Sequence, residues 1–432
     1  MLHDTYSFYP FGPLLSWLKS IQLWIADPYM ARSTSIMANP SADAAAILRR
    51  VGFATLFFAI PMSALFVRRA VVILAPLAVI LLVIAAVLDG SVRHSGQKLG
   101  AVVASAAGLA GGILLFWTAL SLIWTPFVSE ASERLLNLLA MAAMAVAGYL
   151  ALPDRMRSAN LYILPVGVGL AALTGMTMAL WGTVGFDQEG QSFERGMIVL
   201  VLLLWPALTW LHSRGRNLEA LVLALVVSLG ALFTDDALAL QGLAAGALVF
   251  ALTAISPTFG SRLTALAMAG LLLLAPAVPF LLKPLAEIAL GAKAPFVTSL
   301  ETWRMVVLQE PVRLITGHGL ETFLRGRAFG LVPPAAPQSL LFEVWYELGL
   351  VGAAAGAALL FRSALGAGGH RPVLGPGIMA AFATAFALGC LGIGTVQVWW
   401  FTALVVVILV FVAVERGQFR TKRPKAVFRP LR

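Results

Sequence analysis

Residues 283–352 read KPLAEIALGAKAPFVTSLETWRMVVLQEPVRLITGHGLETFLRGRAFGLVPPAAPQSLLFEVWYELGLVG. This is the long charged stretch of a chain that is otherwise apolar, and it enters an apolar helix near Gln338. Irregular, charged backbone is not stable among lipid tails, because its polar groups find no hydrogen-bond partners there. We therefore expect the stretch at a membrane face or in a water-filled cavity, with the rest of the chain as its scaffold.

The composition is that of a membrane protein. Of 432 residues, 60% are hydrophobic and 12% are charged, whereas a soluble domain has roughly 25% charged residues. The sequence predicts an all-α, polytopic integral membrane protein with about twelve transmembrane helices, because apolar runs of about 17–25 residues recur along the chain. The helices are expected at 51–67, 70–88, 101–123, 134–152, 160–181, 196–211, 218–234, 237–255, 263–282, 338–361, 374–392 and 394–414.

Lysine and arginine orient these helices. Cytoplasmic loops that follow the positive-inside rule account for the net charge of +10, so nucleic acid is not expected as a partner. Both termini are predicted to be cytoplasmic. Arg68 and Arg69 break the pattern, so either they serve a site or the first two spans are misplaced. The predicted segments are 1–50, cytoplasmic or interfacial; 51–282, nine transmembrane helices; 283–337, the large outer loop; 338–414, three transmembrane helices; and 415–432, a basic cytoplasmic tail.

The N-terminal segment and the single cysteine carry less information. Residues 17–24 hold two tryptophans and three aliphatic side chains that suit an interfacial amphipathic helix, and Met37 is an alternative start of the protein. Cys390 excludes an intrachain disulfide, and its apolar surroundings do not suit a metal ligand or a nucleophile. Since the sequence has no metal-binding or nucleotide-binding motif, neither a metal nor a cofactor is expected.

The long loop has its own local signals. Thr298-Ser-Leu-Glu301 has the form of a capping box and predicts a short surface helix that ends before Pro311. Its apolar face would hold Leu300, Trp303, Val306 and Val307, with Arg304 near the polar edge. His318 lies between Gly317 and Gly319, which permit a tight turn close to a ligand, although a lone histidine is more often structural.

Arginines in the outer loops need an explanation, because the positive-inside rule disfavours them there. One interpretation is that they bind an anion. The other is that they are solvated or pair with neighbouring glutamates, such as Glu301, Glu310 and Glu321. We take as candidate ligands of an anion Arg195, Arg304, Arg313, Arg325 and Arg327.

Four motifs occur in a fixed order along the chain. They are Trp117-Thr-Ala-Leu-Ser-Leu-Ile-Trp124-Thr-Pro126, Phe193-Glu-Arg195-Gly196, Glu310-Pro311 followed by Gly317-His318-Gly319, and Glu347-Leu-Gly-Leu-Val-Gly352. With these motifs the chain resembles, from about residue 50 onward, the O-antigen ligase and Wzy-type polysaccharide polymerase superfamily of membrane glycosyltransferases.

The resemblance implies a place and a reaction. It implies a periplasmic loop, the bacterial inner membrane, and transfer of a glycan from an undecaprenyl-pyrophosphate-linked donor to a lipid or glycan acceptor. Arginines would hold the pyrophosphate, whose negative charge grows as the sugar–phosphate bond breaks. A histidine would act as the base on the acceptor hydroxyl. Arg195 matches one arginine of the family.

The chain departs from the family pattern at the base. The family histidine falls on Gln338, the following asparagine on Ser339, and a second arginine near Ser299. A glutamine is not a general base. Either His318, Glu343 or Glu347 replaces the base, or electrostatic stabilisation suffices, or catalysis is lost. The candidate catalytic residues are His318, Glu343 and Gln338. Glu347, which shares a helix face with Glu343, joins the arginines as a substrate-binding candidate.

Two other classes of function compete with glycan transfer. A non-catalytic subunit of a polysaccharide assembly complex would explain the missing histidine. A transporter would place ionisable residues at mid-membrane, but the predicted spans are nearly free of charge. Asp235-Asp236 is expected in the turn after 218–234. Neighbouring genes for sugar-nucleotide glycosyltransferases and a lipid-linked glycan flippase would favour the glycan pathway.

Overall fold

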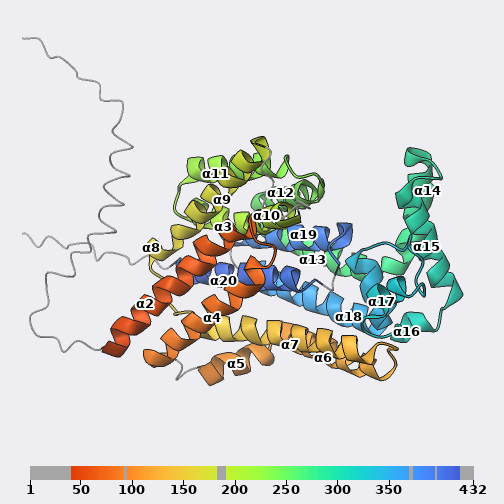
Figure 1. Cartoon of the computed structure of the whole chain (residues 1–432), viewed down its shortest axis with the longest axis horizontal. Coiled ribbons are helices and arrows are strands. Elements are labelled where there is room, and N and C mark those ends of the chain that lie inside the picture. The colour runs from red at the N-terminus through yellow and green to blue at the C-terminus, as the bar shows by residue number, and fades with distance from the viewer. Residues whose placement is uncertain (1–39, 92–94, 182–190, 369–372, 395–396, 419–432) are drawn as a thin grey trace, which may run out of the picture. The chain divides into compact units, whose positions relative to one another are not determined.

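The computed structural model describes residues 40–91, 95–181, 191–368, 373–394 and 397–418. Two compact units divide the chain, residues 1–43 and 44–432, and only the last four residues of the first unit are described. The amphipathic segment expected at 17–24, Met37 and the basic tail from 419 lie outside the described residues. Within them the protein is all α-helical, with no strand (Figure 1).

Nine helical segments of the described chain are long and apolar enough to cross a membrane. A bent pair of helices makes a tenth, and two further apolar helices are shorter, Asn217–Ala231 (α11) and Gly375–Leu391 (α19). The nine are Pro40–Ala64 (α2, a π-helical segment and α3), Ala70–Leu88 (α4), Ala106–Ile123 (α6 with a 3-10 turn), Val128–Ala151 (α7), Ser158–Leu180 (α8 and α9), Gln191–Ser213 (α10), Leu238–Ile255 (α12), Leu340–Gly368 (α18) and Val398–Arg416 (α20). The chain is therefore a multi-pass membrane protein.

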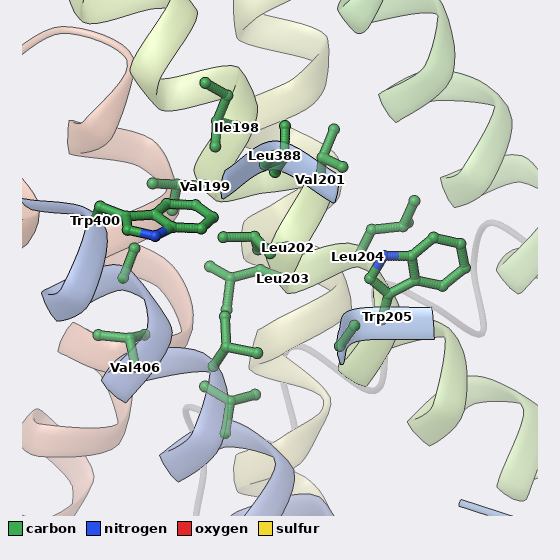
Figure 2. Close-up of a cluster of buried hydrophobic side chains, with 14 of the residues drawn as sticks. Ile198, Val199, Val201, Leu202, Leu203, Leu204, Trp205, Leu388, Trp400 and Val406 are labelled. Atoms are coloured by element: carbon green, nitrogen blue, oxygen red, sulfur yellow. The ribbon is translucent and has the colours of Figure 1, made fainter. Parts of the chain in front are cut away.

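Helix α10 is the centre of the bundle. In the most apolar 18-residue stretch of α10, 83% of the residues are buried, whereas the same fraction for α7 is 11%. Protein rather than lipid therefore surrounds α10. Figure 2 shows its Leu202, Leu203 and Trp205 among side chains of other helices, including Leu388 of α19 and Trp400 of α20. A helix that is apolar on all sides is expected in such an enclosed position.

The first transmembrane helix starts earlier than predicted. α2 begins at Pro40, and the helix continues through the π-helical Thr55–Ala59 to α3 (Ile60–Ala64). The helix therefore starts eleven residues before the predicted residue 51, because the helix-forming alanines before Ile47 extend it. Arg49 pairs with Asp89 at the far end of α4, at 2.6 Å.

Arg68 and Arg69 lie in the exposed turn between α3 and α4. Helices lie on both sides of them, as predicted, although the first begins at Pro40 and not at residue 51. A Cβ placed on Gly196 would lie 2.7 Å from Leu65 Cα, so this turn is at the same end of the bundle as Arg195.

Prolines bend the chain after α13 (Pro257–Leu273). Pro276 and Pro279 end one helix and start the next, α14 (Val278–Leu290), with a 67° bend between the two halves of the pair. α14 continues through Pro284, so the helix predicted to end at residue 282 ends at Leu290 instead.

The remainder of the long loop is helical in short pieces. They are α15 (Pro295–Gln309), α16 (Arg313–Thr316) and α17 (Thr322–Ala328). α15 ends before Pro311 as predicted but starts at Pro295, so Thr298 is inside the helix and does not cap it. The Thr298 hydroxyl donates to the Pro295 carbonyl at 2.8 Å. Val297, Leu300 and Trp303 form the buried face of α15.

α18 begins later than predicted and is broken. The helix starts at Leu340, so Gln338 is an exposed residue before the helix and does not open it. Ser339 occupies the cap position, and its carbonyl accepts from Glu343 N at 2.9 Å. At Gly349 the backbone turns to φ 62° and ψ −160°, which interrupts the continuous helix predicted over 338–361. Figure 1 shows α16 and α17 beside the first half of α18.

Candidate functional site

The break at Gly349 leaves three backbone carbonyls of α18 available to other segments. Tyr346 O accepts from His318 N at 2.8 Å, and Glu347 O accepts from Gly319 N at 2.9 Å. Leu348 O accepts from the Trp117 indole at 2.8 Å. Inside a continuous helix, each carbonyl accepts a hydrogen bond from the N–H group four residues later. Because of the break, these three carbonyls of α18 accept hydrogen bonds from the loop and from Trp117 instead.

Glycines make the close approach of loop and helix possible. Gly317 and Gly319 both have positive φ, and a Cβ on Gly349 would lie 2.5 Å from Ile315 O. Such contacts exclude any side chain at these positions. The sequence predicts that the Gly-His-Gly turn approaches a ligand, whereas in the structure Gly317 approaches the backbone of Glu347 in α18 and Gly319 that of Thr125.

The segment from Trp117 to Pro126 clamps the same loop from the other side. The Thr125 hydroxyl donates to Leu320 O at 2.8 Å, and Leu320 N donates to the Ser121 hydroxyl at 3.3 Å. The motif at 117–126 therefore contacts the motifs at 310–319 and 347–352, which lie about 200 residues later in the chain. The three motifs form one structure at the first half of α18.

A buried ion cluster lies directly beside this structure. Arg134, in the second turn of α7, donates to both carboxylate oxygens of Glu347, at 3.1 and 2.9 Å, and to Glu321 at 3.4 Å. The side chains of these three residues are only 10%, 4% and 5% exposed. Glu347 also accepts from Phe323 N at 3.3 Å. The cluster ties α7, α17 and α18 together.

A cavity of about 190 Å³ opens next to the cluster. Its lining combines carboxylates, guanidinium groups and an amide with apolar side chains of α20. Arg325 Nε, at the cavity, lies 4.0 Å from Glu321 Oε2. The lining residues are Glu130, Glu133, Arg134, Asn137, Leu138, Met141, Glu321, Leu324, Arg325, Val398 and Phe401.

Arg195 does not line this cavity, but it contacts the first turn of α20, two residues of which do. Its guanidinium is 5.3 Å from the Trp399 ring centroid, while Val398 and Phe401 line the cavity. Arg195 is inside the N-terminal part of α10, which starts at Gln191 and not at the predicted residue 196. Together with the Arg134–Glu347 pair, these contacts place the first turns of α7, α10, α18 and α20 at one end of the bundle.

His318 has two hydrogen-bonding partners. Its Nδ1 is 2.9 Å from Tyr346 O, and its Nε2 is 2.8 Å from Glu310 Oε2. The ring stacks on Tyr346 with centroids 4.1 Å apart. Since both ring nitrogens are engaged, an acceptor hydroxyl would have to displace Glu310 before His318 could take a proton. His318 lines a second, much smaller cavity with Arg313, which does not include the Arg134 cluster.

The other predicted residues are dispersed. Glu343 is buried in α18, with Oε1 close to Gly394. Arg304 donates to Glu301 at 3.0 Å, and Lys283 bonds the same carboxylate at 2.5 Å. Arg327 donates to Pro334 O at 3.0 Å. Of the predicted residues, the structure thus places Arg325 at the cavity and Glu347 behind it, paired with Arg134, and leaves Arg304, Arg313 and Arg327 elsewhere.

Arg134 and Glu321 are absent from the residues predicted as ligands or catalysts. A signal for Arg134 exists in the sequence, since a glutamate in an apolar helix such as Glu347 requires a cation. Which cation supplies that charge depends on packing between α7 and α18, about 200 residues apart.

No protein family and no curated protein sequence matches the chain. Within the described residues, no group of three or more His, Cys, Asp or Glu side chains is arranged to hold a metal ion.

Proposed function

We propose that the protein transfers or polymerises a glycan that is linked to undecaprenyl pyrophosphate, on the periplasmic side of the bacterial inner membrane. In this proposal Arg195 binds the pyrophosphate, and the cavity beside Arg134 receives the lipid or glycan acceptor. The protein crosses the membrane twelve times, with both termini in the cytoplasm and residues 283–337 outside.

One observation carries the proposal. The motifs at 117–126, 310–319 and 347–352 are remote in sequence, yet they bond to one another around the break in α18. Motifs that merely fill separate helices would have no reason to meet. Their junction borders a charged cavity at the end of the bundle where four helices start, and ligand sites of membrane proteins favour such broken helices.

The arrangement of charge also supports the proposal over a transporter. Arg134 and Glu347 form a tight ion pair within about two turns of the starts of their helices, whereas transporters place ionisable groups near mid-membrane. Asp235 and Asp236 lie in the turn between α11 and α12, as the sequence predicts.

The orientation can be tested with reporters. Gly215 is in the turn between α10 and α11, and Pro334 is in the segment before α18. An enzymatic reporter that is active only in the cytoplasm should be active when fused at Gly215 and inactive at Pro334, with the reverse result for a periplasmic reporter. Equal activity at the two positions would contradict the topology.

Arg195→Lys should lower transfer by roughly tenfold or more at normal protein levels, because lysine keeps the charge but loses the planar fork that grips two phosphate oxygens. The measurement is the initial rate of release of polyprenyl pyrophosphate by purified protein in liposomes. Arg262→Lys, at an exposed position in α13, is the matched control and should match wild type. A wild-type rate for Arg195→Lys would remove Arg195 from the site.

The proposed function itself is tested by deletion of the gene and by analysis of surface polysaccharide. Loss of attached glycan indicates a ligase, and a change in glycan length indicates a polymerase. The protein should also release polyprenyl pyrophosphate from a lipid-linked oligosaccharide in liposomes. If the cell phenotype is present but purified protein never transfers glycan from any lipid-linked donor, the protein is a subunit of an assembly complex instead.

A further inference from the structure

Glu321 has an unusual backbone conformation. Among the described residues, it is the one non-glycine residue with positive φ, at φ 67° and ψ 0°. A side chain in this left-handed region is disfavoured relative to glycine. Such residues persist where the surrounding structure holds them, and they cluster at functional sites. The neighbouring Gly317 and Gly319 supply positive φ without this cost, and glycine at 321 would have done the same.

The two glutamates of the ion cluster are held differently. Glu347 receives two hydrogen bonds from Arg134 and one from Phe323 N. Glu321 receives one long hydrogen bond from Arg134, at 3.4 Å, and its Oε2 is 4.0 Å from Arg325 Nε, beyond hydrogen-bonding distance. Glu347 is thus an anchor of the fold, whereas Glu321 retains acceptor capacity toward the cavity that it lines.

The cavity suits a neutral, hydroxyl-bearing group. Three carboxylates and two guanidinium groups line it. One of the guanidinium groups, that of Arg134, is already paired with Glu347, which does not line the cavity. Excess negative charge disfavours a phosphate there. Carboxylate and amide oxygens, with Phe401 and Val398 as an apolar wall, match the polar edges and apolar faces of a sugar.

We propose that Glu321 is the general base that accepts the proton of the acceptor hydroxyl, an inference that rests on the proposed function. In the step, the acceptor oxygen bonds to the anomeric carbon as its proton moves to a Glu321 carboxylate oxygen. The bond between that carbon and the pyrophosphate oxygen breaks, and polyprenyl pyrophosphate leaves with the electron pair. The proton then passes from Glu321 to water at the cavity mouth.

The environment supports this role. Burial raises the pKa of Glu321 above its ordinary value, while the Arg134 and Arg325 charges oppose the rise. Other charges that face it are Glu130 and Glu133 of α7 and Glu347 of α18. A base is most effective when its pKa approaches the working pH. Transfer should therefore fall as the pH drops through this raised pKa, because Glu321 becomes protonated.

The experiment uses full-length protein in liposomes with a lipid-linked oligosaccharide and a sugar acceptor. Glu321→Gln and Glu321→Gly should each lower the rate at least 100-fold, on the scale of general-base catalysis, and abolish the acid limb of the pH profile. Glu321→Gly should keep or raise the unfolding temperature, since it relieves the left-handed conformation. Added formate should restore part of the rate of Glu321→Gly. Glu219→Gly, at the other end of the bundle, is the control and should not respond to formate.

The outcomes separate the two proposals. If wild type transfers no glycan, the proposed function fails. If wild type transfers glycan and Glu321→Gln keeps both its rate and its pH profile, Glu321 is not the base. A lowered unfolding temperature in Glu321→Gly, without any rescue by formate, would assign Glu321 a purely structural role and overturn the inference.

Discussion

Arg134→Ala is expected to destabilise the protein by about 3–5 kcal/mol, the range for removing one partner of a buried ion pair. The alanine leaves Glu347 and Glu321 as uncompensated carboxylates whose side chains are almost fully enclosed. It also disconnects α7 from α17 and α18, so glycan transfer should be lost. The measurement is thermal unfolding of the purified protein in detergent, followed by tryptophan fluorescence.

A control and a compensating variant test the reason for the loss. Arg216→Ala removes an exposed ion pair with Glu219 at the other end of the bundle and should cost at most about 1 kcal/mol. Arg134→Leu combined with Glu347→Leu removes the tighter ion pair as a whole and leaves Glu321 without Arg134, so it should recover part of the stability. If Arg134→Ala unfolds at the wild-type temperature, the cluster contributes no stability to the fold.

Gly349→Ala is expected to have an effect of similar size, roughly 3–5 kcal/mol, from backbone strain and lost hydrogen bonds. Gly349 has a conformation that side chains rarely adopt, and an added Cβ would lie 2.5 Å from Ile315 O and 2.6 Å from Gly317 N. The alanine would displace the loop from α18 and break its bonds to Tyr346 and Glu347. Proteolysis of the loop should accelerate, and the unfolding temperature should fall.

Gly366→Ala is the matched control for this prediction, because it lies in the second half of the same helix. A Cβ at Gly366 meets no atom within 4 Å, so the alanine should stabilise the helix by about 0.5–1 kcal/mol. If Gly349→Ala lowers the stability and Gly366→Ala raises it, the loss is due to the break at Gly349 and not to alanine in this helix. A wild-type unfolding temperature for Gly349→Ala would mean that the break is not required for the packing of the loop.

The class of the protein and most of its helices follow from the amino-acid sequence alone. Runs of apolar residues identify spans without any knowledge of packing, because every lipid-facing side chain must be apolar and every backbone group must bond within its own helix. Hence 70–88 and 237–255 were predicted nearly to the residue. Pro311 and Asp235-Asp236 were also predicted correctly as ends and turns, since these residues act through local chemistry.

Tertiary structure decided everything that depends on contacts between distant segments. α18 breaks at Gly349 because the loop and Trp117 supply replacement partners for its carbonyls, and a single helix gives no signal of partners about 30 or 230 residues away. Helix packing likewise decides that Arg325 lies at the cavity while Arg304, Arg313 and Arg327 do not, and that Arg134 pairs with Glu347. The strain at Glu321 has the same origin: local preference opposes a left-handed glutamate, and it persists because the enclosing α7, α17 and α18 hold it there.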